Sequence, residues 1–371
     1  MTGPTKRKVA RRISGHAAGP TVRPWVDHGR KYLGMVMQPG AAAGRFEPWR
    51  LAVGQLSQEQ IVAALTVVLL LGFSLGLQGF ATAANFLDLL RSISKLGILG
   101  LGMGLIIISR GIDLSEVAMM AGSWCVALTA IPRGLSPFWA AVLALTICVA
   151  VGLFNGVMVA FVEAPALFVT LATAYVIYGA AYWFASAFVA YAPLDAPWLV
   201  FAGRGTLLGI PMPILVFAAA ALVVHAFLSR TSIGRFIYAQ GDNPEAARLT
   251  GVALRPLTIL EYVLVAALAW LAGLVWIGET GSMQMAIVQG TTIFDVILVV
   301  VLGGISLVGG RGGVFSVVAG CALIGTLLNA FTIMNVNSEV QNIIRGVVLL
   351  AAIILDNLLH PRDEETARQG D

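Results

Sequence analysis

Four side chains with carboxylate or amide chemistry lie in or beside long apolar stretches of this sequence. Asp113, Glu116 and Asp295 carry carboxylates, and Asn155 carries an amide. Ionisable groups at membrane depth usually face a cavity or a charged partner. These groups could contact a polar solute, or they could satisfy backbone amides at helix ends and bond neighbouring helices together. For Asn155 we favour bonding between helices, and Glu116 could pair with Arg110.

Motifs of enzymes are weak or missing in the sequence. Gly72-Phe-Ser-Leu-Gly76 matches the G-x-S-x-G nucleophile pattern, which requires a strand, a turn and a helix, but it lies in an apolar run. Its glycine spacing is typical of helix packing. The four histidines form no H-E-x-x-H motif, and no phosphate-binding G-x-x-x-x-G-K-[ST] loop occurs. We therefore expect no catalytic residue, metal or cofactor on this chain.

The polar segment 229–251 has the strongest signals of a specified local structure. Asn243 can cap a helix, Pro244 suits the first helical position, and Glu245 complements the positive end of the helix dipole. Good helix formers and a terminating glycine follow: Ala246, Ala247, Arg248, Leu249 and Gly251. The segment predicts a short helix of about two turns that could transmit force from a soluble partner.

The elements that must position these residues are membrane helices. The sequence is 58% hydrophobic and 11% charged, against about 25% charged in soluble proteins. Its apolar runs have the length of about 20 residues that crosses a bilayer as a helix, and alternating β-barrel patterning is missing. We predict an all-α polytopic membrane protein with about ten transmembrane helices. The expected spans are 61–80, 92–109, 116–131, 138–161, 166–185, 208–228, 257–277, 292–308, 314–334 and 340–357.

Charge asymmetry orients these helices. The expected domains are a basic tail at 1–60, a membrane domain at 61–357 and a second tail at 358–371. With ten spans, 18 of the 23 Lys and Arg residues, including those of loop 228–256, fall on the side of the termini. The positive-inside rule places that side in the cytoplasm. The first tail is better explained as a topology anchor touching anionic lipids than as a nucleic-acid arm.

Several co-linear segments, covering about residues 60–357, resemble the permeases of ATP-binding-cassette (ABC) importers, in the branch that serves ribose and related sugars. They are Gly111-Ile-Asp-Leu-Ser115; Phe154-Asn155-Gly156 with Pro165 and Thr170-Leu171; Gly234-Arg235-Phe-Ile-Tyr-Ala with Glu245-Ala246-Ala247 and Gly251; and Phe294-Asp295 through Leu302-Gly303-Gly304 to Gly309-Gly310-Arg311-Gly312, with Asp356 ending the last span. Glu116 departs from the family pattern, which has a small or apolar residue there.

The resemblance implies roles for two groups of residues. Those expected to couple the permease to an ATPase are Gly234, Arg235, Asn243, Glu245, Ala246, Ala247, Arg248 and Gly251. Those expected to line the solute path or to have a structural role are Asp113, Ser115, Glu116, Asn155, Thr170, Asp295 and Arg311.

The resemblance also implies the partners of the chain. They are a second permease chain, identical or paralogous, two ABC subunits that hold ATP and Mg, and an external solute-binding protein, all at a bacterial inner membrane. The alternative is a secondary transporter driven by an ion gradient, which could use the buried carboxylates. That alternative does not explain why the sequence specifies a capped helix near Glu245.

Overall fold

The computed structural model describes residues 57–185, 189–193 and 196–359. The basic N-terminal tail up to residue 56 and the C-terminal residues from 360 lie outside the described residues, as does the side chain of Asp356. Our expectations for both tails and for Asp356 therefore stay predictions.

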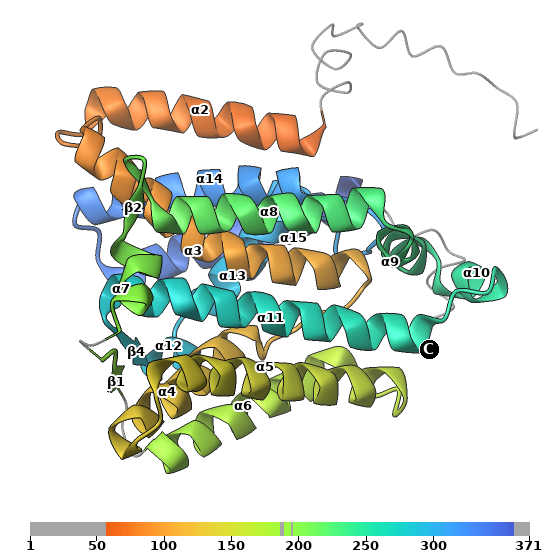
Figure 1. Ribbon diagram of the computed structural model, residues 1–371. Coiled ribbons are helices and arrows are strands. Elements are labelled where there is room, and N and C mark those ends of the chain that lie inside the picture. The colour runs from red at the N-terminus through yellow and green to blue at the C-terminus, as the bar shows by residue number, and fades with distance from the viewer. Residues whose placement is uncertain (1–56, 186–188, 194–195, 360–371) are drawn as a thin grey trace, which may run out of the picture. The chain divides into compact units, whose positions relative to one another are not determined.

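The described residues form a bundle of helices (Figure 1). Ten helices overlap the ten expected spans: α2 (Gln58–Gly76), α3 (Ala83–Ile108), α4 (Glu116–Ala130), α5 (Pro137–Ala160), α6 (Ala166–Ala185), α8 (Met212–Arg230), α11 (Leu254–Thr280), α13 (Thr292–Gly303), α14 (Val314–Ile333) and α15 (Ser338–Leu359). Seven helices of the described part are long and apolar enough to cross a membrane, and α4, α13 and α15 fall outside that set. The all-α polytopic class is confirmed, while the count of ten stays a prediction.

Shorter elements close the two ends of the bundle. Between α8 and α11 lie α9 (Ser232–Asp242) and α10 (Pro244–Leu249), and before α8 and α13 lie α7 (Pro197–Arg204) and α12 (Ala286–Gln289). Strand β1 (Val189–Tyr191) pairs antiparallel with β4 (Ser282–Gln284), and β2 (Thr206–Leu207) with β3 (Ile210–Pro211). Figure 1 shows α9 and α10 at one end of the helices and β1 with β4 at the other. We call these the α10 end and the strand end.

Helix α11 lies at the centre of the packing, against α3, α4, α5 and α7. The Trp124 ring of α4 stacks on that of Trp270 with centroids 6.0 Å apart, and the Trp124 indole N–H donates to the Trp270 carbonyl at 3.0 Å. On α5, a Cβ added to Gly152 would lie only 2.6 Å from the Tyr262 carbonyl oxygen. Glycine is therefore required where α5 meets α11, as expected for close helix packing.

Two of the apolar helices are too short to cross a bilayer because the backbone is interrupted. Helix α4 has 15 residues and follows the irregular segment 109–115, and α13 has 12 residues and follows α12. The expected span 292–308 is wrong at its end because Gly304 adopts a left-handed φ of 107° and stops α13 there. Non-helical backbone at membrane depth is tolerated where it is buried in protein or lines a cavity. The two interruptions are therefore candidate positions for a functional site.

Candidate functional site

A buried polar network holds the interruption between α3 and α4. Asp113 Oδ1 accepts hydrogen bonds from the backbone N–H of Ser115 at 2.8 Å and from its hydroxyl at 2.5 Å. The Asn155 amide of α5 donates to Ser115 Oγ at 2.9 Å and accepts from Thr173 Oγ1 of α6 at 2.8 Å. All four residues are buried. The network therefore binds the start of α4 to α5 and α6.

These contacts settle how several of the expected path residues are placed. Thr170, also fully buried, accepts a hydrogen bond from the Leu114 N–H at 3.1 Å. Thr170 and Asp113 satisfy backbone N–H groups that the interruption leaves without helical partners, and Asn155 bonds across helices. Because they are buried, these side chains do not line an open passage in this conformation. Thr173 was missed by sequence reasoning, since a threonine inside an apolar helix gives no signal of its own.

The network makes a specific prediction about stability. Replacing Thr173 by valine keeps the shape of the side chain but removes the donor to Asn155, and we expect a loss of about 1 kcal/mol. Thr146→Val is the matched control, because Thr146 is exposed on α5 and its hydroxyl donates to the Val142 carbonyl of its own helix. Thermal unfolding of the two purified variants in detergent gives the comparison. Equal midpoints would contradict a stabilising network.

Glu116 is more isolated than expected. It is fully buried, and neither of its carboxylate oxygens has a hydrogen-bond partner among the described residues. One oxygen lies so close to Gly102 of α3 that a Cβ on that glycine would collide with it. The expected pair with Arg110 is wrong, because Arg110 turns away and donates to the Gly241 carbonyl at 2.6 Å and to the Asp242 carbonyl at 2.5 Å.

A further buried carboxylate, Glu261, was missed by sequence reasoning. It lies inside α11, is 1% exposed and accepts a hydrogen bond from the Ser109 hydroxyl at 2.8 Å. Its signal in the sequence was the same as that of Glu116, a carboxylate within an apolar run. No group of three metal-ligating side chains occurs in the part of the chain that the structure describes.

Asp295 has a charged partner. Its carboxylate lies 3.4 Å from Arg345 of α15, and Arg345 also donates to Thr291 Oγ1 at 2.7 Å. The start of α13 is thereby tied to α15, an ion pair that the sequence could not show across 50 residues. Its geometry favours the structural interpretation of Asp295 over a direct solute contact.

At the α10 end, the capped helix predicted from the sequence is confirmed. Helix α10 starts at Pro244, the Asn243 side chain accepts a hydrogen bond from the Ala246 N–H at 3.0 Å, and Gly251 follows with φ of 90°. Ala247 is buried, whereas Glu245 and Leu249 are exposed, Leu249 by 87%. The helix is therefore held by one face and presents the other, together with exposed Ala246 and Arg248, away from the bundle.

Helix α9 occupies the part of the polar segment before Asn243 for which no helix is predicted from the sequence, and it connects α10 to the bundle. Its start is fixed by Thr231, whose side chain accepts from the Gly234 N–H at 3.0 Å, and a Cβ on Gly234 would collide with the Leu228 carbonyl. Arg235 lies exposed on α9. At its other end, Gly241 packs so tightly on the Ile108 carbonyl of α3 that no side chain fits.

The loop between α13 and α14 meets α9 at the same place. Gly310 donates its N–H to Ile108 O at 2.8 Å, and the Tyr238 hydroxyl of α9 donates to Gly312 O at 2.8 Å. Burial, with a smaller contribution from the Glu59 carboxylate, raises the pKa of Tyr238 and keeps it a hydrogen-bond donor. Arg311 is exposed between these contacts. Three segments far apart in sequence, the end of α3, α9 and this glycine loop, thus form one joint.

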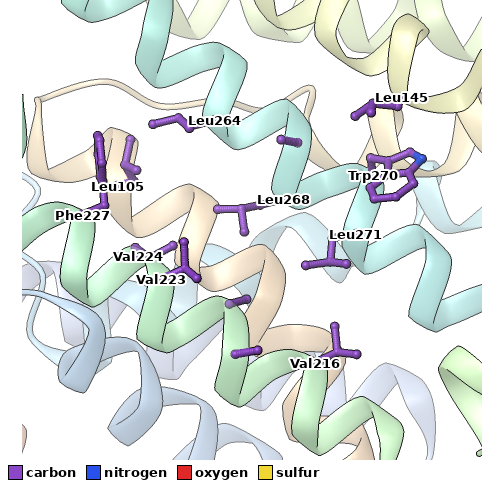
Figure 2. Close-up of a pocket in the computed structure, with 13 residues that line it drawn as sticks. Leu105, Leu145, Val216, Val223, Val224, Phe227, Leu264, Leu268, Trp270 and Leu271 are labelled. Atoms are coloured by element: carbon purple, nitrogen blue, oxygen red, sulfur yellow. The ribbon is translucent and has the colours of Figure 1, made fainter. Parts of the chain in front are cut away.

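A groove of about 620 Å³ lies between α3, α5, α8 and α11 (Figure 2). Figure 2 shows Val223 and Phe227 of α8 and Leu268 and Leu271 of α11 among its lining side chains. Among the described residues that line it, Trp270 carries the one polar side-chain group, an indole N–H that already donates to the Ala141 carbonyl at 3.0 Å. An apolar groove on membrane helices suits hydrocarbon, and it offers no hydrogen bonds to a polar solute.

A bundle of membrane helices with two interrupted members, a buried polar network and a capped helix at one end has the architecture of a transport permease. The comparisons agree. The model of the family described as branched-chain amino acid transport system / permease component matches residues 85–353. The chain belongs to this family of ABC transporter permeases.

Curated relatives that the chain matches are sugar permeases. It is 32% identical to the ribose import permease of Escherichia coli (strain K12) over 81% of this chain and 94% of the relative. Identity to the ribose import permease of Bacillus subtilis (strain 168) is 32%, over 75% and 86% of the two chains, and to the L-arabinose transport permease of E. coli 33%, over 82% and 92%. These relatives are transporter components and not enzymes. No solved structure matches the chain significantly.

Proposed function

We propose that this chain is the membrane-spanning subunit of an ATP-driven importer that carries a sugar or sugar-like solute across a bacterial inner membrane. The observation that carries the proposal is α10, a helix capped at Asn243 and ended at Gly251 that presents Glu245 and Leu249 away from the bundle. An exposed apolar residue beside charged ones on a short, rigid helix fits docking into a cleft of another protein. The names of the relatives supply the solute class.

The proposed complex has further chains. A second permease, identical or paralogous, would complete the path, and two ABC subunits would bind ATP and Mg, for which this sequence has no phosphate loop. A solute-binding protein would deliver the sugar to the strand end. The α10 end, with both termini, would face the cytoplasm, in line with the distribution of Lys and Arg.

The joint around Gly241 gives the proposed coupling a physical route. Motion of α10 moves α9, because only the capping residue Asn243 separates them. Gly241 of α9 packs on the Ile108 carbonyl at the end of α3. Its own carbonyl accepts a hydrogen bond from Arg110, which lies in the interruption that the Asp113 network holds. Rigid helices joined at an interruption form a two-state element that a distant ligand can bias. ATP-driven closure of the ATPase subunits is the proposed source of that bias.

Gly241→Ala is expected to weaken coupling. The added Cβ collides with the Ile108 carbonyl, so α9 must shift away from α3. We expect uptake to fall about tenfold, the equivalent of about 1.4 kcal/mol lost from the coupled step, while ATP hydrolysis continues. Gly72→Ala on α2 is the control, because nothing lies within 4 Å of a Cβ there. Uptake and hydrolysis measured together in proteoliposomes decide the matter, and unchanged coupling would contradict the route through α9.

The energy source is tested separately. The complete complex is reconstituted, and uptake of D-ribose, L-arabinose and D-allose is measured with the proton and sodium gradients collapsed and ATP present. Continued uptake supports the importer, and uptake that stops at once with ATP abundant supports the gradient-driven alternative. Leucine and valine belong in the same panel because of the family description. Preferential uptake of either would overturn the sugar assignment while leaving the ATP-driven class intact.

A further inference from the structure

A second cavity, of about 470 Å³, lies between α4, α6, α12 and α13. This volume is within the range of about 300–1,000 Å³ typical of small-molecule sites. Its wall combines aromatic rings with an amide: Tyr175 and Tyr178 of α6, Gln289 of α12 and Phe294 of α13. We call it the tyrosine cavity.

The depth of Tyr175 argues that water or protein, and not lipid, faces this cavity. Helix α6 has 20 residues, about 30 Å of rise, and Tyr175 is near its middle. Tyrosines that anchor helices at lipid headgroups lie near helix ends, which Tyr175 does not. Tyr175 is 72% exposed. Leaving its hydroxyl in hydrocarbon is costly, so a polar surrounding at mid-depth is the more stable arrangement.

The two interrupted helices converge on the tyrosine cavity. Leu114 and Val117 come from the start of α4, and Gly290 and Phe294 come from the start of α13. Broken helices that meet at mid-membrane are a feature of solute sites in transporters, because their free backbone groups need a polar or protein surrounding. The Asp113 network and the Asp295–Arg345 pair hold these two starts in place without entering the lining of the cavity.

The chemistry of the side chains that line the cavity favours a neutral solute over an ionic one. None of the described residues that line the cavity is charged, so an ionic solute would lose its hydration without gaining a counter-charge. Tyr175 and Phe294, residues that are 72% and 55% exposed, offer flat apolar rings, and the Gln289 amide offers a donor and an acceptor. A neutral solute with several hydroxyls on a compact carbon ring matches both. The apolar groove of Figure 2 offers apolar surfaces but no free hydrogen-bonding side chain among its described lining residues.

We infer that the tyrosine cavity is this subunit's part of the solute path, and that Tyr175, Gln289 and Phe294 contact a neutral polyhydroxylated solute as it passes. The inference rests on the proposed function and deepens it by naming the contact residues. It also explains how a permease with its carboxylates buried elsewhere can provide a polar passage.

Water access is tested first, because it needs no solute. Tyr175→Cys and Val223→Cys place thiols at two mid-helix positions of similar exposure, 72% and 67% in the native residues, of which Val223 lies in the apolar groove. The three native cysteines are buried and give a low background. A small water-soluble thiol reagent is added to the full complex in proteoliposomes. Because only a hydrated thiol ionises and reacts readily, we expect labelling at least about tenfold faster at position 175. Equal rates would overturn the inference.

Solute contact is tested with matched glutamine variants. Gln289→Leu removes the amide from the cavity, whereas Gln284→Leu changes an exposed glutamine of β4 that does not line it. Losing one hydrogen bond to the passing solute is expected to slow uptake of D-ribose about fivefold to tenfold, with ATP hydrolysis unchanged. Protection of the Tyr175→Cys thiol by D-ribose during ATP-driven turnover is the second expected result. Equal uptake in both variants together with unprotected labelling would overturn the assignment.

Failure of this inference and failure of the proposed function give different results. If the unmodified complex transports sugar with ATP but Tyr175→Cys remains unlabelled, the cavity is outside the path and the importer assignment stands. If the unmodified complex shows no ATP-dependent uptake, the proposed function fails whatever the labelling shows.

Discussion

Leu249→Glu is expected to abolish ATP-driven uptake, to below about a hundredth of the unmodified level, while the bundle stays folded. Leu249 is 87% exposed on α10, where an apolar side chain costs free energy unless another protein covers it. Central apolar contacts of an interface contribute about 2 kcal/mol or more, and a buried unpaired carboxylate adds a further penalty. Both effects act on the docking of the ATPase, and neither acts on the membrane helices.

The measurement for Leu249→Glu is retention of the ATPase subunit on the purified permease, followed by uptake in proteoliposomes. Leu208→Glu is the matched control, because Leu208 is another leucine, 95% exposed, in the turn between β2 and β3 at the strand end. We expect it to retain the ATPase. Normal retention by Leu249→Glu would show that α10 is not the docking element, and loss in both variants would point to a general folding defect.

Much of the fold was predictable because its signals are local. Span lengths follow from runs of apolar residues, and the bounds of α6 agree with the expected 166–185. Helix α10 was predictable residue by residue, since Asn243, Pro244 and Gly251 each act within one turn of the chain. Helix α9 was missed because Thr231, which caps its start, is the one local helix signal in the polar stretch before Asn243.

The site was less predictable because its contacts join residues far apart in sequence. Arg110 has Glu116 as its near neighbour in the chain, yet the left-handed backbone at Arg110, φ of 71°, directs it to α9, more than 130 residues away. The Asp295–Arg345 pair and the bond from Thr173 to Asn155 depend in the same way on which helices meet. The polar residues were recognised from the sequence, and their partners required the structure.

These contacts separate the polar residues that hold helices together from those proposed to contact the passing solute. Asp113 Oδ1 and the Asn155 amide make structural hydrogen bonds at the start of α4. The polar side chains of Tyr175 and Gln289 in the tyrosine cavity are instead exposed. Glu116 fits neither group, because it is buried without lining a cavity and without a hydrogen-bond partner among the described residues.

Glu116→Met is therefore expected to make the protein more stable. A buried carboxylate without hydrogen bonds lowers the free energy of unfolding, and an apolar side chain of similar size removes that cost, by about 2 kcal/mol. We expect the unfolding midpoint to rise by about 3 °C. The three buried cysteines make the measurement direct, because a thiol-reactive dye reports their exposure on heating.

Glu261→Met separates this effect from the general removal of a carboxylate. Glu261 is equally buried but accepts a hydrogen bond from the Ser109 hydroxyl at 2.8 Å. Methionine at position 261 removes this bond together with the carboxylate and leaves the hydroxyl with the Ile106 carbonyl, at 2.9 Å, as its acceptor, so the gain in stability is smaller. A midpoint that rises more for Glu116→Met than for Glu261→Met supports the stability argument. If Glu116→Met is stabilised but transports sugar poorly, the cost of burying Glu116 is retained for function, as strained groups near moving elements often are. A midpoint that falls would show that the protein stabilises the Glu116 carboxylate, contrary to the packing around Gly102.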